Sequence, residues 1–250
     1  MGRPGRVAVK ALLPRVIERY KIDFVIANGE NASGGFGITE PSAAEIFASG
    51  VSIITSGNHI WDKKEIIPFI SKEDRLLRPL NYPPGVHGFG SIVSEVPGFG
   101  AIAVINLQGR VFMPAIDCPF RSGLAEVKRL RERTANIIVD FHAEATSEKI
   151  ALGYYLDGKV SAVIGTHTHV QTADEKVLPG GTAYISDVGM TGPAESVLGV
   201  KKEPILEKFL TQMPTRFEIA AGKTVFCALV VEINEKDGRA SSVLRLQLTN

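Results

Sequence analysis

The sequence has little cysteine, no long apolar run and no excess of charge of either sign. Its two cysteines, Cys118 and Cys227, lie far apart and no CxxC motif occurs, so neither a disulfide framework nor a thiolate metal site is expected. No apolar run reaches the ~20 residues of a membrane-spanning helix, and the polar, basic start is not that of a signal peptide. These absences predict a soluble, cytoplasmic protein.

The charge is balanced, with 28 basic and 27 acidic residues and a net charge of +1. Proteins that bind nucleic acid by neutralising phosphates carry an excess of lysine and arginine. Stable nucleic-acid binding is therefore not expected. A local basic cluster at Lys128, Arg129, Arg131 and Arg133 has helical spacing, which favours a solvated helix face.

Short apolar runs rich in β-branched residues alternate with helix-like segments. The predicted strands are residues 23–27, 51–55, 101–106, 136–141, 160–164 and 182–186. The predicted helices are residues 7–20, 41–49, 63–70, 124–134, 147–157 and 203–212. Nearly continuous apolar strands separated by helices indicate a layered α/β fold whose sheet is buried on both faces. We expect a single domain over residues 1–250.

Two further segments complete the expected fold. Residues 223–231 and 242–248 flank the sequence NEKDGRA and predict a closing hairpin. Residues 79–100 are rich in proline and glycine and predict a long loop with a turn at residues 83–85. Residues 31–39 contain several glycines but have neither the dinucleotide-binding spacing nor a Walker motif, so we expect a flexible active-site loop there.

Polar clusters follow five of the predicted strands: NGEN, SGNH, HAE, THTH and SDVG. In an open α/β sheet the carboxyl ends of the strands gather at one edge, where ligands bind. We therefore expect these side chains to converge although they are scattered along the chain. They are Glu30, Asn31, Asn58, His59, His142, His167, His169 and Asp187.

Histidine, carboxylate and amide groups in this number favour a metal centre over a nucleophile triad. Imidazole and carboxylate together suit zinc, iron or manganese. Two ions ~3.5–4 Å apart need a bridging anion; Glu30 can bridge while Asn31 or Asn58 adds an oxygen. Such ions would polarise a bound water to hydroxide and clamp the oxygens of a phosphoryl group. His59, next to Asn58, would protonate the leaving oxygen.

Each of these residues also has a structural explanation when it is considered alone. His142 can be a buried structural histidine, Glu30 a helix cap and Asn58 a turn residue. Asp62 can cap the helix that follows it, and His87 in the Pro/Gly-rich loop is expected at the surface. Ligand types at five strand ends of one sheet edge are harder to explain without a metal.

The segments NGEN, GNHIWD, DFHAEATSEK, GTHTHVQTAD and SDVGMTGP, in this order, closely resemble the YmdB-like family of calcineurin-type metallophosphoesterases over essentially the whole chain. The resemblance implies an α/β/β/α sandwich, with two sheets flanked by helices. It also implies a phosphodiesterase for 2′,3′-cyclic or 3′,5′-cyclic nucleotides. Two divalent ions are implied, iron or manganese, with zinc or magnesium as alternatives. A small phosphodiester is the expected partner, and a homo-oligomer is a further option.

The resemblance also assigns a role to each motif residue. Glu30 becomes the bridging carboxylate and His59 the proton donor. Asn31 and His169 would hold the first ion, whereas Asn58, His142 and His167 would hold the second. On this assignment the two histidines of THTH serve different ions.

One departure from the family pattern affects the first ion. The family has a strand ending in Gly-Asp shortly before a segment like GRPGR, which here occupies residues 2–6. The chain as given is therefore expected to be N-terminally truncated relative to the family, without an aspartate ligand of the first ion. This favours a rival hypothesis, a regulatory or nucleotide-binding protein on the same scaffold, whereas Glu30 and the histidines favour the enzyme. A mononuclear amide hydrolase is a weaker alternative, because the chain shows no dedicated carboxylate base outside the cluster.

Overall fold

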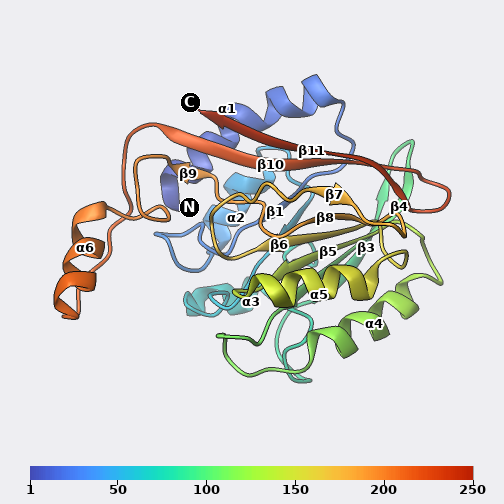
Figure 1. Cartoon of the computed structure of the whole chain (residues 1–250), viewed down its shortest axis with the longest axis horizontal. Helices are drawn as coiled ribbons and strands as arrows, with labels where there is room; N and C mark the ends of the chain where they lie inside the picture. The colour runs from blue at the N-terminus through green and yellow to red at the C-terminus, as the bar shows by residue number, and fades with distance from the viewer. Residues whose placement is uncertain (250) are drawn as a thin grey trace.

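The structure, a computed structural model, describes residues 1–249 and is built around a six-stranded sheet (Figure 1). The order of its strands is β3-β4-β5-β6-β8-β7. They are β3 (Ser91–Val96), β4 (Gly100–Gln108), β5 (Ile137–His142), β6 (Ala162–Thr166), β7 (Lys176–Val177) and β8 (Ala183–Ile185). The strands from β4 to β8 in this order are parallel, and β3 and β7 run antiparallel at the two edges.

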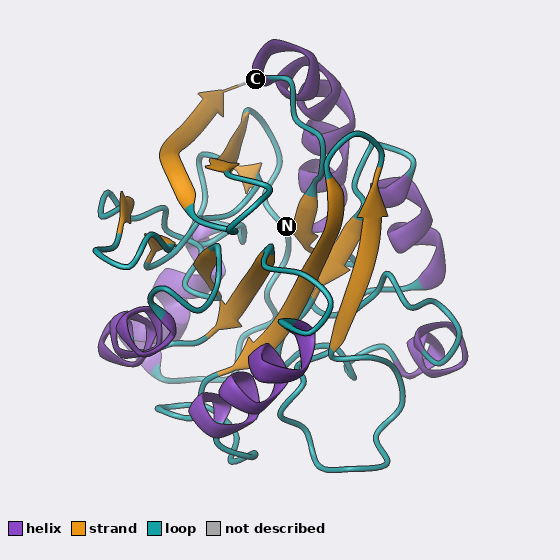
Figure 2. Ribbon diagram, turned by 90° about the vertical axis from the view of Figure 1, so that its right-hand side faces the viewer, coloured by secondary structure: helices purple, strands orange, loops and turns teal. Residues whose placement is uncertain are grey.

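The remaining strands form two smaller sheets that pack on one face of the large sheet. One contains the parallel strands β1 (Ile26–Asn28) and β2 (Ile53–Thr55). The other contains β9 (Gly192–Pro193), β10 (Thr224–Ile233) and β11 (Ala240–Thr249), paired antiparallel. Helices cover the strands from both sides, as Figure 2 shows.

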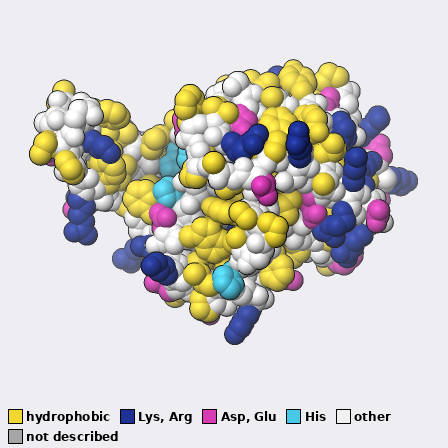
Figure 3. All heavy atoms as spheres, turned by 90° about the horizontal axis from the view of Figure 1, so that it is seen from below, with side chains coloured by type: hydrophobic (Ala, Val, Ile, Leu, Met, Phe, Trp, Pro, Cys, Tyr) yellow, Lys and Arg dark blue, Asp and Glu magenta, His cyan; other side chains and the backbone are white. Residues whose placement is uncertain are grey.

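The helices form the outer layers. Those on the side of the small sheets are α1 (Gly2–Tyr20) and α2 (Glu40–Phe47), and those against the large sheet are α4 (Pro119–Leu130) and α5 (Thr146–Leu156). A 3-10 turn, η1 (Lys64–Ile66), leads into the short α3 (Ile67–Ile70). Helix α6 (Lys202–Thr211) projects from the body as a lobe with exposed hydrophobic side chains (Figure 3), among them Phe209 and Leu210.

Alternation along β5 determines which side chains face the functional site. Ile137, Val139 and Phe141 belong to the core beneath α4 and α5. Because successive side chains of a strand point to opposite faces, Asp140 and His142 lie on the other face, toward the small sheets. The same alternation in β6 places Thr166 on that inner face. The large sheet therefore directs its polar strand ends between the two sheet layers.

The structure confirms the predicted helices and strands, although α1 and α4 begin five residues earlier than expected and residues 64–70 form η1 and α3 in place of one helix. It corrects two expectations about the sheets. Residues 79–100 are not one long loop, because residues 91–96 form β3 and pair with β4. Residues 79–90 do form the expected loop, with a turn at residues 84–85. Pro97 and Gly98 lie in the tight connection between β3 and β4, where Gly98 has a φ of +80°. The exposed basic residues near the end of α4 match the predicted solvated face.

The second correction concerns the number of sheets, because the layer expected to be one sheet is divided in two. Strands β1 and β10 are not hydrogen-bonded to each other. A cavity of about 900 Å³ is lined by residues of β1, of β10 and of α1, and it reaches Asp140 and His142. The fold is thus a mixed α/β sandwich with three sheets. Within residues 1–249, no helix has the length and apolar character needed to cross a membrane.

Candidate metal centre

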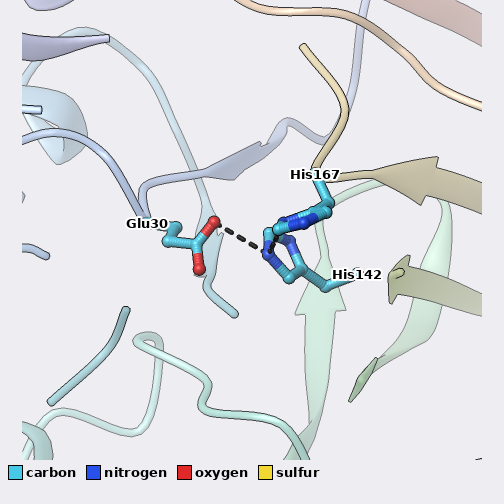
Figure 4. A group of neighbouring side chains, drawn as sticks. All are labelled: Glu30, His142 and His167. Carbon is cyan, nitrogen blue, oxygen red and sulfur yellow. Dashed lines mark hydrogen bonds and ion pairs between the residues drawn. The ribbon is translucent and has the colours of Figure 1, made fainter. Parts of the chain in front are cut away.

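The structure brings the predicted ligand residues together at the carboxyl ends of four strands. Glu30 and Asn31 follow β1, Asn58 and His59 follow β2, His142 ends β5, and His167 and His169 follow β6. The contributing strands belong to both sheet layers, so the side chains meet between them. Figure 4 shows Glu30 facing His142, with the ring of His167 against the ring of His142.

The Nε2 atom of His142 is the centre of this cluster. It lies 2.8 Å from Oε2 of Glu30, 3.2 Å from Oδ1 of Asn58 and 3.0 Å from Nδ1 of His167. A ring nitrogen carries at most one proton, which cannot serve three acceptor-type atoms at once. Ligand atoms of Glu30, His142 and His167 also lie within 4.8 Å of one another. This donor set fits a divalent first-row ion.

Two residues behind His142 determine which of its nitrogens faces the cluster. The hydroxyl of Thr166 donates to Oδ1 of Asp140 at 2.7 Å and lies 3.0 Å from Nδ1 of His142. Since the single hydroxyl proton is directed at Asp140, the hydroxyl oxygen accepts the Nδ1–H of His142. With Nδ1 bonded to Thr166, Nε2 is the nitrogen that faces Glu30, and it would coordinate a metal after releasing the proton that it shares with Glu30.

Burial and neighbouring charges shift the pKa values of the cluster. Burial opposes charge on His142, but the facing Glu30 outweighs it and raises the pKa of His142, so a metal would have to displace that proton. Burial opposes ionisation of Glu30, but the facing His142 and the hydrogen bonds from His142 and His59 outweigh it and lower the pKa of Glu30 to about 2. Burial, reinforced by the neighbouring His142, lowers the pKa of His167 to about 4. Burial also lowers the pKa of His169. An ionised carboxylate and neutral imidazoles are the forms that coordinate metals.

Asn31 and His169 form a second pair beside this cluster. Nε2 of His169 lies 3.1 Å from Oδ1 of Asn31, and its Nδ1 donates to the carbonyl of Leu198 at 3.2 Å. The amide nitrogen of Asn31 donates to the carbonyl oxygen of Gly35 at 2.8 Å, which turns the Asn31 oxygen toward His169. The structure therefore groups these residues as the sequence predicts, and their roles as ligands of two ions stay a prediction.

His59 is held beside the cluster by its backbone and by Asp62. Its N–H donates to Oε1 of Glu30 at 2.8 Å, and its Nδ1 lies 2.8 Å from Oδ2 of Asp62. The predicted role of Asp62 as a helix cap is wrong, because η1 has no side-chain cap and the carboxylate binds the imidazole instead. The ring also packs edge-on against Phe36 at a centroid distance of 5.2 Å.

Sequence reasoning missed the residues that orient the ligands. Asp140 is the only acidic residue of β5 and shares a face with His142, a signal that the apolar run concealed. Thr166 is part of the GTHTH segment but has no metal-ligand chemistry that would single it out. Glu144, whose Oε2 lies 3.1 Å from Nε2 of His167, was not among the predicted residues. His87 is exposed, as expected, and contacts Ser71.

Comparisons with known proteins show the family and the fold of the chain. The family model described as YmdB-like protein matches residues 1–246. The chain is 48% identical over 250 residues to a 2′,3′-cyclic-nucleotide 2′-phosphodiesterase of Bacillus subtilis (strain 168), covering 100% of this chain and 94% of that protein. A hypothetical protein from Thermus thermophilus superposes with a TM-score of 0.93 at 42% identity, covering 100% of this chain and 96% of that one. A novel phosphatase from Mycoplasma pneumoniae gives a TM-score of 0.93 at 32% identity, with 99% and 90% coverage.

Proposed function

The chain belongs to the YmdB-like protein family, and from this premise we propose that it is a metal-dependent phosphodiesterase that hydrolyses 2′,3′-cyclic or 3′,5′-cyclic nucleotides. The observation that carries the proposal is the convergence of Glu30, Asn58 and His167 on one nitrogen of His142, with His59 alongside. The name of the Bacillus relative supports the substrate class.

We assign the ligands to two positions. Glu30, Asn58, His142 and His167 would hold one divalent ion, and Asn31 and His169, with Glu30 as the bridge, would hold the other. Iron or manganese is proposed, with zinc or magnesium as alternatives. Divalent ions in such a centre supply Lewis acidity, which activates water and stabilises negative charge on phosphoryl oxygens.

His59 completes the reaction by moving a proton. Water adds to phosphorus while the bond from phosphorus to one ribose oxygen breaks, and that oxygen needs a proton as it leaves. The carboxylate of Asp62 accepts the Nδ1–H of His59, which leaves Nε2 to carry the proton that is transferred. A histidine with this orientation is suited to general acid catalysis.

The test is hydrolysis by protein stripped with a chelator and reloaded with Mn²⁺ or Fe²⁺. We expect 2′,3′-cyclic AMP or 3′,5′-cyclic AMP to be converted to a monophosphate, measured by chromatography, only when metal is restored. The matched control, His142→Ala, should remain inactive after reloading because it lacks the central ligand. Binding of the cyclic nucleotides without turnover by metal-loaded protein would contradict the proposal and favour a regulatory, nucleotide-binding role.

A further inference from the structure

A buried ion pair lies behind the turn that carries the two neighbouring histidines. Nζ of Lys149 is 2.8 Å from Oδ2 of Asp187, and both side chains are 2% exposed. Within residues 1–249, this is the only ion pair of a lysine or arginine in which both side chains are buried. Removing two charges from water is unfavourable unless further hydrogen bonds satisfy them. Asp187 accepts such hydrogen bonds from the backbone and a hydroxyl nearby.

Those contacts hold Thr168, the residue between the two histidines. Oδ2 of Asp187 accepts the backbone N–H of Thr168 at 2.9 Å and its hydroxyl at 2.8 Å. The other oxygen, Oδ1, accepts the N–H of Gly189 at 2.8 Å. With Lys149 and these donors around it, the carboxylate is fully engaged, so Asp187 acts on the turn and is not itself a ligand.

The turn needs such an anchor because its backbone is strained. His167 has a φ of 105° and His169 a φ of 67°. Both values lie in the region that residues with a Cβ rarely adopt, and such conformations persist only where the surroundings enforce them. This backbone conformation directs the two rings to different partners. The ring of His167 lies 3.0 Å from His142, and the ring of His169 lies 3.1 Å from Asn31.

We propose that Lys149 and Asp187 are positioning residues that hold Thr168, so that the strained turn presents one histidine to each metal position. The inference rests on the proposed function, because it assumes that both histidines bind metal. Lys149 balances the charge of Asp187 in the interior and makes its side-chain hydrogen bond to that carboxylate. The two metal positions are thereby coupled through one carboxylate.

The experiment measures metal binding and does not depend on activity. Thr168→Val removes one donor to Asp187 and leaves the ion pair intact, whereas Thr168→Ser keeps the hydroxyl. The double variant Lys149→Met with Asp187→Asn removes both charges, so that no unpaired charge stays buried. Arg129→Met, which breaks an exposed pair with Glu126 on α4, is the control. Each chelated protein is titrated with Mn²⁺ by calorimetry, and spin coupling between bound ions is followed by electron paramagnetic resonance.

We expect Thr168→Val and the double variant to bind Mn²⁺ about 10–100-fold more weakly and to lose the coupling signal, as is typical when partners of metal ligands are removed. Thr168→Ser and Arg129→Met should match the unmodified protein. Unchanged affinity and coupling in Thr168→Val would overturn the inference even if the double variant did not fold. If the unmodified protein binds no ion, the proposed function fails instead, so the two failures can be told apart.

Discussion

In the proposed reaction His59 takes part without being a metal ligand. Its backbone N–H supports Glu30, while its ring is oriented by Asp62. Substitution by alanine keeps the backbone donor and removes only the ring. Metal binding and proton transfer are therefore separable at this position.

We predict that His59→Ala retains its metal and loses ~10²–10⁴-fold in kcat on a cyclic nucleotide, the usual contribution of a general acid. The loss should be smaller on a nitrophenyl phosphodiester, because nitrophenolate leaves without a proton. Rates on both substrates and the metal content by mass spectrometry test this. Equal losses on the two substrates, or loss of metal, would show that His59 is not the acid.

The clustering of the predicted ligand residues could be expected from the sequence, because each follows an apolar strand or ends one and has a side chain suited to metals. The contact of Asp62 with His59 could not be predicted, because an aspartate just before a helix is equally typical of a helix cap. Asp140 was concealed by the apolar residues around it. Its role depends on which face of β5 points inward, and that is fixed only by packing against the other sheet layer.

At the level of elements, the loop after β2 must approach the end of β5 very closely. A Cβ on Gly57 would lie 2.2 Å from Cδ2 and Nε2 of His142. The glycine in SGNH is therefore required to bring Asn58 within reach of the imidazole. A similar approach occurs away from the site, where a Cβ on Gly153 of α5 would lie 2.7 Å from the ring of Tyr184.

These two glycines give a matched pair of substitutions. Gly57→Ala and Gly153→Ala should each lower the free energy of unfolding of the chelated protein by about 1–3 kcal/mol, the usual effect of overpacking. Only Gly57→Ala should weaken metal binding, because only its methyl group displaces a ligand. Urea unfolding and metal titration of both variants test this. Equal metal affinity in the two variants would mean that the loop can move without disturbing His142.

Element boundaries were predicted best where periodicity is strong and worst at the sheet edges. The long runs of β4, β5 and β10 are apolar enough to be recognised without knowing their partners. Strand β3 was missed since the prolines and glycines flanking it dominate its surroundings. The two-residue strands β7 and β9 have no pattern of their own, because they exist only through pairing with β8 and β10.

For the whole molecule, the sequence predicted the layered sandwich but not the division of one layer into two sheets. Pairing between strands far apart in the chain is not encoded in local patterns, and β1 and β10 are separated by a cavity. The same long-range arrangement decides where the site lies. Glu30 and Asn58 come from the small-sheet layer, and His142 and His167 from the large sheet, so the cluster spans the interface of the two layers.

A metal ion bound by residues of both layers should stabilise the whole fold. A ligand that binds only the native state at 100 times its Kd adds about 2.7 kcal/mol. For a chain of this size, 1 kcal/mol shifts Tm by roughly 2–4 °C, so removing one such ion should lower Tm by about 5–10 °C. Calorimetry of the metal-loaded and chelated proteins measures the difference. His142→Ala, which lacks the central ligand, should show almost no response to the chelator. A chelator-independent Tm in the unmodified protein would mean that the cluster does not link the two layers through a metal.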